Sequence, residues 1–348
     1  DGEFAVTLFD FEKNIIIMST DIFSTKPLWY SIENKNIGIC TYKSGLERLR
    51  FKNIKKIEAN TTYIISLSDY SIIEKKIIYK FDLKQHKNTF NDWIKSFNLS
   101  ILKRTQHLQY DAFVCLSSGY DSGCICSTLN NNNISYYTYT ILAEENVDII
   151  NKRIRINKKS HCKQENIYQL SKKEYNYSKK YLKKNCEEFV YTFKTKKNKK
   201  ELLTDDKGAV GMSYIFDQVK KRKHRIYLSG QGVDEIYSDY GYNGKKFYSH
   251  SNFGGYFPKE LETIFPWTSF YRGTQESYLS KEEHVSGCFG IEGRYPFLDK
   301  NVVQEFLWLT PELKNKYYKS PLHNYMNKYQ YPFDENKKIG FRAASNLK

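Results

Sequence analysis

Short apolar runs separated by polar turns dominate the first part of the chain. Runs rich in β-branched and aromatic residues occur at residues 4–9, 15–18, 37–41, 62–66 and 72–79. Runs of this length and composition are typical of β-strands bounded by turns. The pattern therefore predicts an antiparallel β-sheet in this part of the protein.

A helical period replaces this pattern further along the chain. Apolar residues recur at helical spacing through residues 90–109, which predicts a helix. A short apolar run at residues 111–116 leads into a turn of small residues at 117–123, and a helical stretch follows to Leu129. A strand, a small-residue turn and a helix in this order predict the opening of an α/β nucleotide-binding unit.

Two further apolar runs extend the α/β pattern. Residues 136–142 and 225–228 have the composition of buried strands, with helical stretches between them. Such alternation favours a parallel sheet with both faces covered. The predicted fold class is therefore α/β, with a partial antiparallel β domain over residues 1–85 and a parallel-sheet domain over residues 86–348. The Lys-rich segment 175–205 shows no readable period.

Composition and charge narrow the class of protein. The 348 residues carry a formal net charge of +16, but 27% are charged and 16% are aromatic, which excludes a globally disordered chain. Clustered basic residues would suit nucleic acid, yet abundant Lys, Ile and Tyr together are also typical of an AT-rich coding sequence. The basic runs at 179–184, 194–200 and 220–225 lack an aromatic-interleaved RNA-binding pattern. We therefore predict solvated helix faces or loops there, and no nucleic-acid partner.

The cysteines and the lack of long apolar stretches indicate the cellular compartment of the protein. Seven cysteines, an odd number without a Cys-x-x-Cys pair, fit neither a disulfide framework nor a zinc site. No run approaches the roughly 18 apolar residues of a membrane span, and no signal-peptide pattern is visible. We expect a cytoplasmic protein without membrane contact.

The first small-residue turn carries candidate phosphate-binding groups. Ser117, Ser118 and Ser122 supply hydroxyl donors, Gly119 permits close approach of a ligand, and Asp121 can bind Mg²⁺. Backbone N–H groups in such a turn, with the positive end of the next helix, favour phosphate. The same residues would also suit an ordinary helix cap. No Walker A loop is present, because no Gly-Lys-Ser/Thr follows.

A second turn, at residues 229–235, has a similar character. Gly230 and Gly232 flank one residue and let the backbone turn tightly, and Asp234 and Glu235 follow directly. Paired acids are suited to Mg²⁺, although they would also be favourable at the start of a helix. Two such turns in one α/β domain favour a nucleotide site.

Six segments spread over nearly the whole chain match the motifs of one known family, in that family's order. Residues 117–122 are similar to SGGxDS, with Ser118 in place of the first glycine, and residues 228–235 are similar to LSGEGxDE, with Gln231 in place of glutamate. Four more segments are similar to DGxFA, DxFGxKPLYY, GIEARVPFLD and KKxGF, at residues 1–5, 21–30, 290–299 and 337–341. The chain thus resembles the glutamine-dependent asparagine synthetases.

The resemblance implies part of an N-terminal-nucleophile glutaminase at residues 1–85 and a pyrophosphatase-loop synthetase at residues 86–348. It implies an AMP-forming ligase that uses ATP and Mg²⁺ to activate a carboxylate, with aspartate as the leading choice, as an acyl-adenylate that reacts with ammonia. The ATP-binding residues that it implies are Leu116, Ser117, Ser118, Gly119, Asp121, Ser122, Ile141, Ser229 and Gly230. It implies Asp121 and Asp234 for Mg²⁺, and Lys319 and Gln231 for catalysis. For Arg294 and Asp299, a structural pair near the site is an alternative to a role as reactive groups.

Two departures from the family pattern leave the function open. No N-terminal cysteine nucleophile is present, so we expect this chain alone not to hydrolyse glutamine, with a missing or separate half completing that domain. Gln231 cannot accept a proton, as the family's glutamate does. The alternatives are an acyl-adenylating enzyme that forms another amide or a lactam, a pyrophosphatase-loop tRNA-modifying enzyme, and a catalytically weakened regulatory homologue. A homodimer also stays open.

Overall fold

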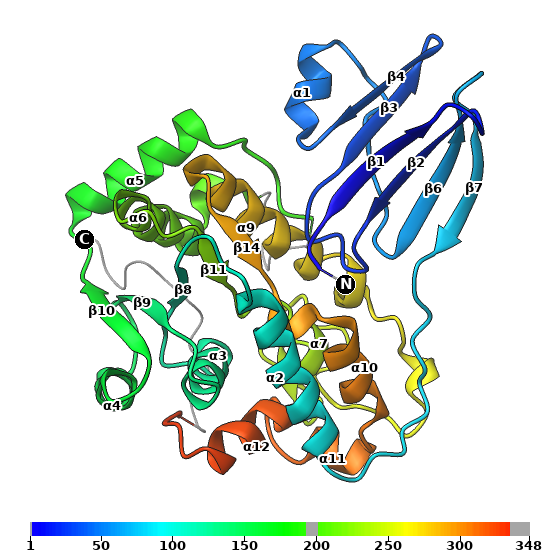
Figure 1. Ribbon diagram of the computed structural model, residues 1–348. Helices are drawn as coiled ribbons and strands as arrows, with labels where there is room; N and C mark the ends of the chain where they lie inside the picture. The colour runs from blue at the N-terminus through cyan, green and yellow to red at the C-terminus, as the bar shows by residue number, and fades with distance from the viewer. Residues whose placement is uncertain (1, 193–200, 335–348) are drawn as a thin grey trace.

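The computed structural model describes residues 2–192 and 201–334, which form antiparallel β-sheets followed by an α/β region (Figure 1). Asp1, the basic run at 194–200 and the KKxGF-like segment at 337–341 lie outside the described residues. The mixed α/β class predicted from the sequence is confirmed. The boundary placed between residues 85 and 86 stays a prediction.

The N-terminal strands form two antiparallel sheets that pack on each other. One sheet has the order β1-β2-β6-β7 and the other β4-β3-β5. Between them lies a small core that includes Ile16 and Met18 of the first sheet and Tyr30 of the second. The bounds are β1 (Ala5–Asp10), β2 (Ile15–Thr20), β3 (Trp29–Glu33), β4 (Asn36–Cys40), α1 (Lys43–Arg48), β5 (Lys55–Lys56), β6 (Thr61–Ser66) and β7 (Ile72–Ile77). All five predicted strands are present, whereas β3, β5 and α1 were not predicted.

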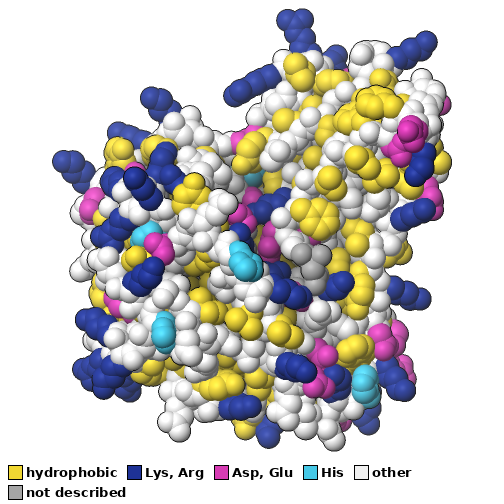
Figure 2. Space-filling model, viewed as in Figure 1, with side chains coloured by type: hydrophobic (Ala, Val, Ile, Leu, Met, Phe, Trp, Pro, Cys, Tyr) yellow, Lys and Arg dark blue, Asp and Glu magenta, His cyan; other side chains and the backbone are white. Residues whose placement is uncertain are grey.

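Strand β1 lies at the edge of its sheet and is poorly covered. Val6 and Leu8 of this strand are 46% and 53% exposed, and Phe11, which follows it, is 79% exposed. Figure 2 shows apolar side chains gathered over this sheet, while Lys and Arg are distributed around the outline of the same face. Because burial is small, β1 is stabilised mainly by its pairing with β2.

The second region is built on a five-stranded sheet in which every neighbouring pair is parallel. Its strand order is β10-β9-β8-β11-β14. The bounds are β8 (Ala112–Cys115), β9 (Tyr136–Ile141), β10 (Cys162–Tyr168), β11 (Ile226–Leu228) and β14 (Glu292–Arg294). The three strands predicted here are confirmed as β8, β9 and β11, and they form the centre of the sheet.

Helices cover both faces of this sheet, as parallel strands require (Figure 1). One layer contains α2 (Asn91–Thr105), α3 (Tyr120–Asn131), α4 (Val147–Lys158), α10 (Lys300–Trp308) and α12 (Ser320–Lys328). The other contains α5 (Lys172–Asn185), α6 (Lys207–Lys221) and α9 (Thr274–Phe289). The remaining short helices and strands are α7 (Val233–Tyr237), β12 (Gly241–Tyr242), β13 (Lys245–Lys246), α8 (Thr268–Tyr271), α11 (Pro311–Asn315) and two 3₁₀ turns, Leu203–Asp205 and Leu261–Thr263.

Helix α5 explains why the Lys-rich segment had no readable period. It buries only Ser178 and Leu182, so its apolar stripe is too thin to appear in the sequence. The basic run at 179–184 lies on this helix, and most of its side chains are exposed or half-buried. Across the described ranges no helix is long and apolar enough to cross a bilayer.

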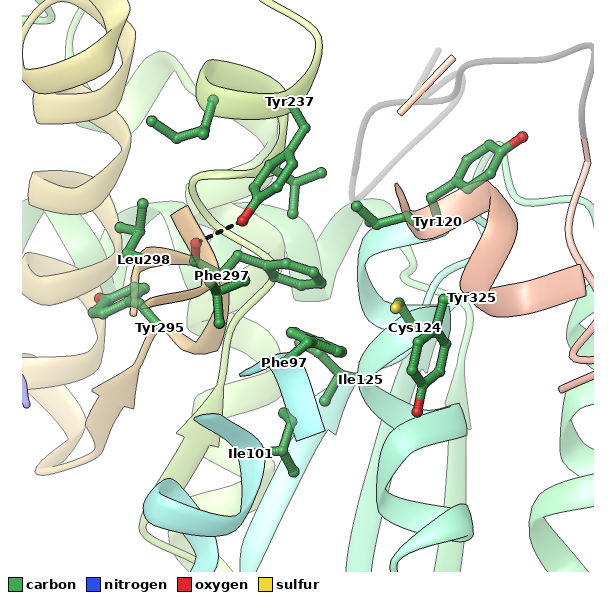
Figure 3. Packing of buried hydrophobic residues seen from close by; sticks show 14 of the residues in the cluster. Phe97, Ile101, Tyr120, Cys124, Ile125, Tyr237, Tyr295, Phe297, Leu298 and Tyr325 are labelled. Atoms are coloured by element: carbon green, nitrogen blue, oxygen red, sulfur yellow. Dashed lines mark hydrogen bonds between the residues drawn. The ribbon is translucent and has the colours of Figure 1, made fainter. Parts of the chain in front are cut away.

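The GIEGRYPFLD segment forms β14 and then a short 3₁₀ turn, Pro296–Leu298, that is buried in the main core. Phe297 stacks on Phe97 of α2 with ring centroids 4.5 Å apart. The Tyr237 hydroxyl donates a hydrogen bond to the Phe297 carbonyl at 3.1 Å (Figure 3). Phe297 of this motif therefore packs between α2 and α7.

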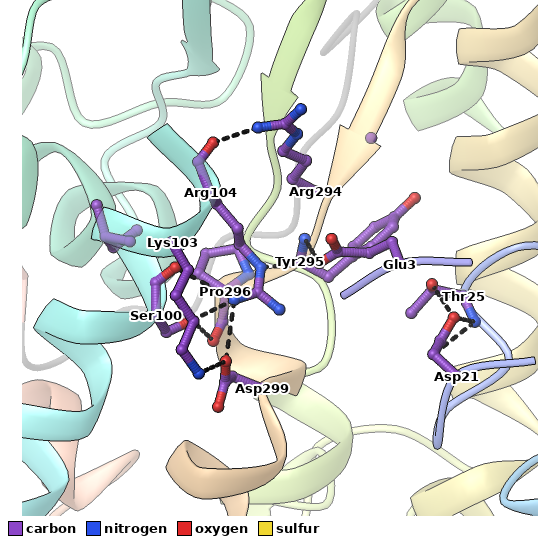
Figure 4. A network of polar contacts seen from close by, with 12 residues as sticks. Glu3, Asp21, Thr25, Ser100, Lys103, Arg104, Arg294, Tyr295, Pro296 and Asp299 are labelled. Atoms are coloured by element: carbon purple, nitrogen blue, oxygen red, sulfur yellow. Dashed lines mark hydrogen bonds and ion pairs between the residues drawn. The ribbon is translucent and has the colours of Figure 1, made fainter. Parts of the chain in front are cut away.

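A buried polar network joins the N-terminal end of the chain to α2 and α10 (Figure 4). The Arg104 guanidinium lies 2.8 Å from Glu3 and 3.1 Å from Asp299. Arg294 instead pairs with Glu292 at 2.8 Å and donates to the Arg104 carbonyl at 2.6 Å. The predicted Arg294–Asp299 pair is therefore wrong, because Asp299 caps α10 and faces α2 while Arg294 reaches the carbonyl end of α2.

We expect Arg104→Met to lower the free energy of unfolding by about 3–5 kcal/mol, because Glu3 would become a buried carboxylate without a cation and Asp299 would keep only the partly exposed Lys103. Lys103→Met is the matched control. Lys103 reaches the same Asp299 at 3.2 Å, but its side chain is 42% exposed, so its loss should cost about 1 kcal/mol or less. Urea unfolding measures both variants, and equal losses would contradict the network's role.

Candidate active site

The two predicted loops meet because β8 and β11 are adjacent parallel strands. Ala112 pairs with Ile226, so both strands end at the same edge of the sheet. One strand leads through residues 116–119 into α3, and the other leads through residues 229–232 into α7. The loops touch so closely that a Cβ atom on Gly230 would lie 2.7 Å from the Asp121 Cβ. A larger residue at position 230 would clash with Asp121, so the close contact between the loops requires glycine there.

A cavity of about 560 Å³ opens at this edge, within the size range of small-molecule sites. It is lined by groups from α3, α6, α7 and α9 and from the segment before α12. The predicted residues that line it are Ser117, Gly119, Asp121, Ser122, Ser229, Gly230, Gln231, Asp234 and Lys319. The structure thus brings together nine of the predicted site residues from three distant parts of the sequence.

Three predicted ATP-binding residues lie outside this lining. Leu116 and Ile141 are 2% and 1% exposed and pack in the cores on opposite faces of the sheet. Ser118 is also buried, and its N–H and hydroxyl both donate to the Glu145 carboxylate. Nucleotide contact by these three stays a prediction to which the cavity lends no support.

The first loop is held in shape by its own serines. The Ser117 and Ser122 hydroxyl oxygens are 2.9 Å apart, and the Gly119 N–H donates to the Ser117 hydroxyl at 3.2 Å. The Ser117 N–H also donates to Ser122 at 3.0 Å. These bonds fix the hydroxyls beside the N-terminus of α3, where an anion is favoured.

Lys319 connects the two loops. Its ammonium lies 2.7 and 3.0 Å from the two Asp121 carboxylate oxygens and 3.1 Å from Asp234, and its side chain is 4% exposed. Burial lowers the pKa of Lys319, but the two carboxylates outweigh burial and hold that pKa above its usual value. Its backbone is left-handed, with φ of 51°, an uncommon conformation that the surrounding contacts must maintain.

The donor set fits a phosphate-bound Mg²⁺ better than a cation held by protein alone. Asp121 and Asp234 converge on one point, the Lys319 ammonium, and stay 28% and 21% exposed. The described part of the chain contains no cluster of three or more acidic, histidine or cysteine ligands. Mg²⁺ commonly uses one or two carboxylates and takes its other ligands from phosphate and water.

Gln231 and Glu235 form the inner wall beside the second loop. The Gln231 N–H donates to the Ser229 hydroxyl at 3.0 Å, and the buried Gln231 side-chain amide interacts with the Glu235 carboxylate. Burial, with a smaller contribution from the nearby Asp234, raises the pKa of Glu235 to about 7. Glu235 accepts a hydrogen bond from the Tyr240 hydroxyl, which stabilises its ionised form.

Sequence reasoning missed the far wall of the cavity, which α6 and α9 supply. Asp206, Lys281 and Glu282 line it. Lys281 lies 3.6 Å from Asp206, and burial raises the pKa of Glu282 to about 7. In the sequence, the run from Ser280 to Glu283 has the composition of a solvated helix surface, so no local signal marks it as a site.

Comparisons with known proteins agree with the motif resemblance. No protein-family model matches the chain. A protein of Methanocaldococcus jannaschii named putative glutamine-hydrolysing asparagine synthetase 1 is 24% identical in an alignment of length 334 that covers 90% of this chain. The chain spans only 57% of that relative's length. The resemblance predicted from the motifs is confirmed by this match.

Two solved structures show weaker likeness. The glutamine phosphoribosylpyrophosphate amidotransferase of B. subtilis matches with 8% identity and a TM-score of 0.21, over 49% of this chain and 48% of its own. The NMN synthetase of Francisella tularensis matches with 9% identity and a TM-score of 0.30, over 73% of this chain and 100% of its own.

We expect Glu282→Gln to stabilise the protein at alkaline pH. The folded protein holds the Glu282 proton up to about pH 7, whereas the unfolded chain releases it near pH 4.3. Stability contributed by this group therefore falls as pH rises between these values, and glutamine removes the penalty. The gain in unfolding free energy should be about 2 kcal/mol larger at pH 8 than at pH 5.

Urea denaturation at the two pH values measures this gain. Glu276→Gln is the control, because Glu276 lies on the same helix but is 30% exposed and pairs with Lys56. Its effect should change little between pH 5 and pH 8. A Glu282→Gln effect that is independent of pH would show that the pKa of Glu282 is not raised.

Proposed function

We propose that this protein is an ATP-dependent, AMP-forming carbon–nitrogen ligase that converts a carboxylate to an amide, with aspartate and ammonia as the leading substrates. One observation carries the proposal: Lys319 is buried between Asp121 and Asp234 where two glycine-containing loops meet on one cavity. The sequence match to the M. jannaschii relative supports the same reaction class.

The first loop is suited to the leaving pyrophosphate. Backbone N–H groups in the first turn of α3 and the Ser117 and Ser122 hydroxyls would donate to phosphate oxygens. Negative charge grows on these oxygens as pyrophosphate departs. Donors fixed in advance at that position lower the barrier without having to reorganise.

Lys319 would neutralise the same developing charge from the other side. The Lys319 ammonium is already withdrawn from water between Asp121 and Asp234. It can therefore turn towards a phosphate at little further desolvation cost. Asp121 and Asp234 would hold Mg²⁺, which would supply further charge neutralisation for the phosphates.

The proposed reaction has two steps. A substrate carboxylate oxygen attacks the α-phosphorus of ATP, and the bond from that phosphorus to pyrophosphate breaks, which leaves an acyl-adenylate. An amine then attacks the acyl carbon, and AMP leaves with the electron pair of the broken carbon–oxygen bond. The residues of the chain orient these groups, exclude water and hold the charges.

Gln231 favours a second candidate, a related enzyme that forms a different amide or a lactam. Its buried side-chain amide lines the cavity beside Glu235 and can donate a hydrogen bond to a substrate carbonyl or carboxylate, which an ionised glutamate at this position could not do. An ATP–pyrophosphate exchange screen over small carboxylic acids separates the two candidates, because only the true acid promotes exchange.

We expect Asp121→Asn to lower ATP–pyrophosphate exchange on the order of 100-fold, because the amide keeps the shape of Asp121 but loses a charge for Lys319 and Mg²⁺. Asp217→Asn is the control: Asp217 lies on α6, pairs with the exposed Lys221 at 2.6 Å, and does not line the cavity. Full exchange activity in Asp121→Asn would refute the role of the two loops.

A further inference from the structure

Helix α9 carries two consecutive acids that have different surroundings. Glu283 is tied by structural bonds, since its Oε1 accepts from the Lys26 ammonium at 2.6 Å and the Tyr295 hydroxyl at 2.6 Å. Glu282 lines the cavity and is 6% exposed, and its Oε2 is buried without a hydrogen-bond partner among the described residues. Glu282 is thus a buried acid with one carboxylate oxygen that the described residues leave without a hydrogen bond.

Few nearby groups stabilise a negative charge on the Glu282 carboxylate. Burial has the largest effect and raises its pKa to about 7, while the Lys281 ammonium and the Ser229 hydroxyl lower it by less. Glu283 on the same helix and Glu235 on α7 raise it slightly. The other titratable groups that sense its charge are Cys115 of β8, Tyr227 of β11 and Tyr295 after β14.

Three of the other polar groups in the lining are engaged or cannot titrate. Gln231 is an amide, and Glu235 already accepts a hydrogen bond from Tyr240 and stands next to the proposed Mg²⁺ ligand Asp234. Asp206 accepts from the Tyr191 hydroxyl, lies near Lys281, and caps α6. Glu282, by contrast, has one carboxylate oxygen without a hydrogen-bond partner among the described residues and interacts with the Ser229 hydroxyl of the second loop.

We propose that Glu282 is the general base of the amide-forming step, an inference that rests on the proposed function. The amine nitrogen forms a bond to the acyl carbon of the adenylate, and one N–H proton passes to the Glu282 carboxylate. The carbon–oxygen bond to AMP breaks, and its electron pair leaves with the AMP phosphate. Glu282 thereby supplies the proton acceptor that Gln231 cannot provide.

The experiment measures the two steps separately with L-aspartate, MgATP and ammonium chloride. In Glu282→Gln, amide formation in single turnover should fall by about 10²–10⁴, the usual worth of a general base, while ATP–pyrophosphate exchange changes less than about threefold. Glu276→Gln, the control on the same helix, should leave both steps unchanged. Glu282→Asp keeps a carboxylate and should fall between the wild type and Glu282→Gln.

A pH profile distinguishes a base from a residue that only shapes the cavity. At a fixed concentration of free ammonia, the wild-type amide step should accelerate as pH rises through about 7, where Glu282 loses its proton. Glu282→Gln should lack this rise. A purely structural role would lower the rate without removing the pH dependence.

The outcomes separate the two proposals. If the wild type catalyses exchange and Glu282→Gln forms amide at the wild-type rate, the general-base role is overturned while the ligase function stands. Equal loss of exchange and amide formation in Glu282→Gln would also overturn the base role, since Glu282 would then serve adenylation or structure. Failure of the wild type to catalyse exchange would overturn the proposed function and this inference with it.

Discussion

The buried Lys319 ammonium is the interaction on which the cavity depends. A buried cation is costly unless carboxylates compensate it, and here Asp121 and Asp234 do so from the starts of two different helices. Lys319 and Asp121 are 198 positions apart in the sequence. The Tyr318 hydroxyl adds a bond to Asp234 at 3.0 Å, so the chain before α12 is fixed against both loops.

The cavity contains acids of two kinds. Asp121 and Asp234 face an ammonium at one end, whereas burial raises the pKa of Glu235 and of Glu282 to about 7. The first kind suits phosphate and Mg²⁺ chemistry, and the second suits proton transfer near neutral pH. The two proposals thus assign two steps of one reaction to different walls of a single cavity.

Helix α9 links this cavity to the N-terminal sheets. Glu282 faces the cavity, while Glu283 binds Lys26 from the segment between β2 and β3. A second connection runs from Glu3 through Arg104 to Asp299. Because both connections are buried ion pairs that lose much if one partner is removed, the sheets and the α/β region support each other's packing.

Much of this protein can be predicted from its sequence. Period and composition predicted the antiparallel strands, α2, and the central strands β8, β9 and β11, because these elements are set by local patterns of apolar residues. The small residues at 117–122 and 229–235 predicted two ligand loops, because tight turns and close approach restrict which residues fit.

Only the tertiary structure decided which charges meet. Local patterns could not show that Asp299 contacts Arg104 instead of Arg294, or that Leu116, Ser118 and Ile141 lie outside the cavity lining. Nor could they show that Glu282 lines the cavity while Glu283 binds Lys26 and Tyr295. Electrostatic partners and burial depend on residues far apart in the sequence. The pKa of a carboxyl group is set by that burial and those partners, and these exist only once the chain has folded.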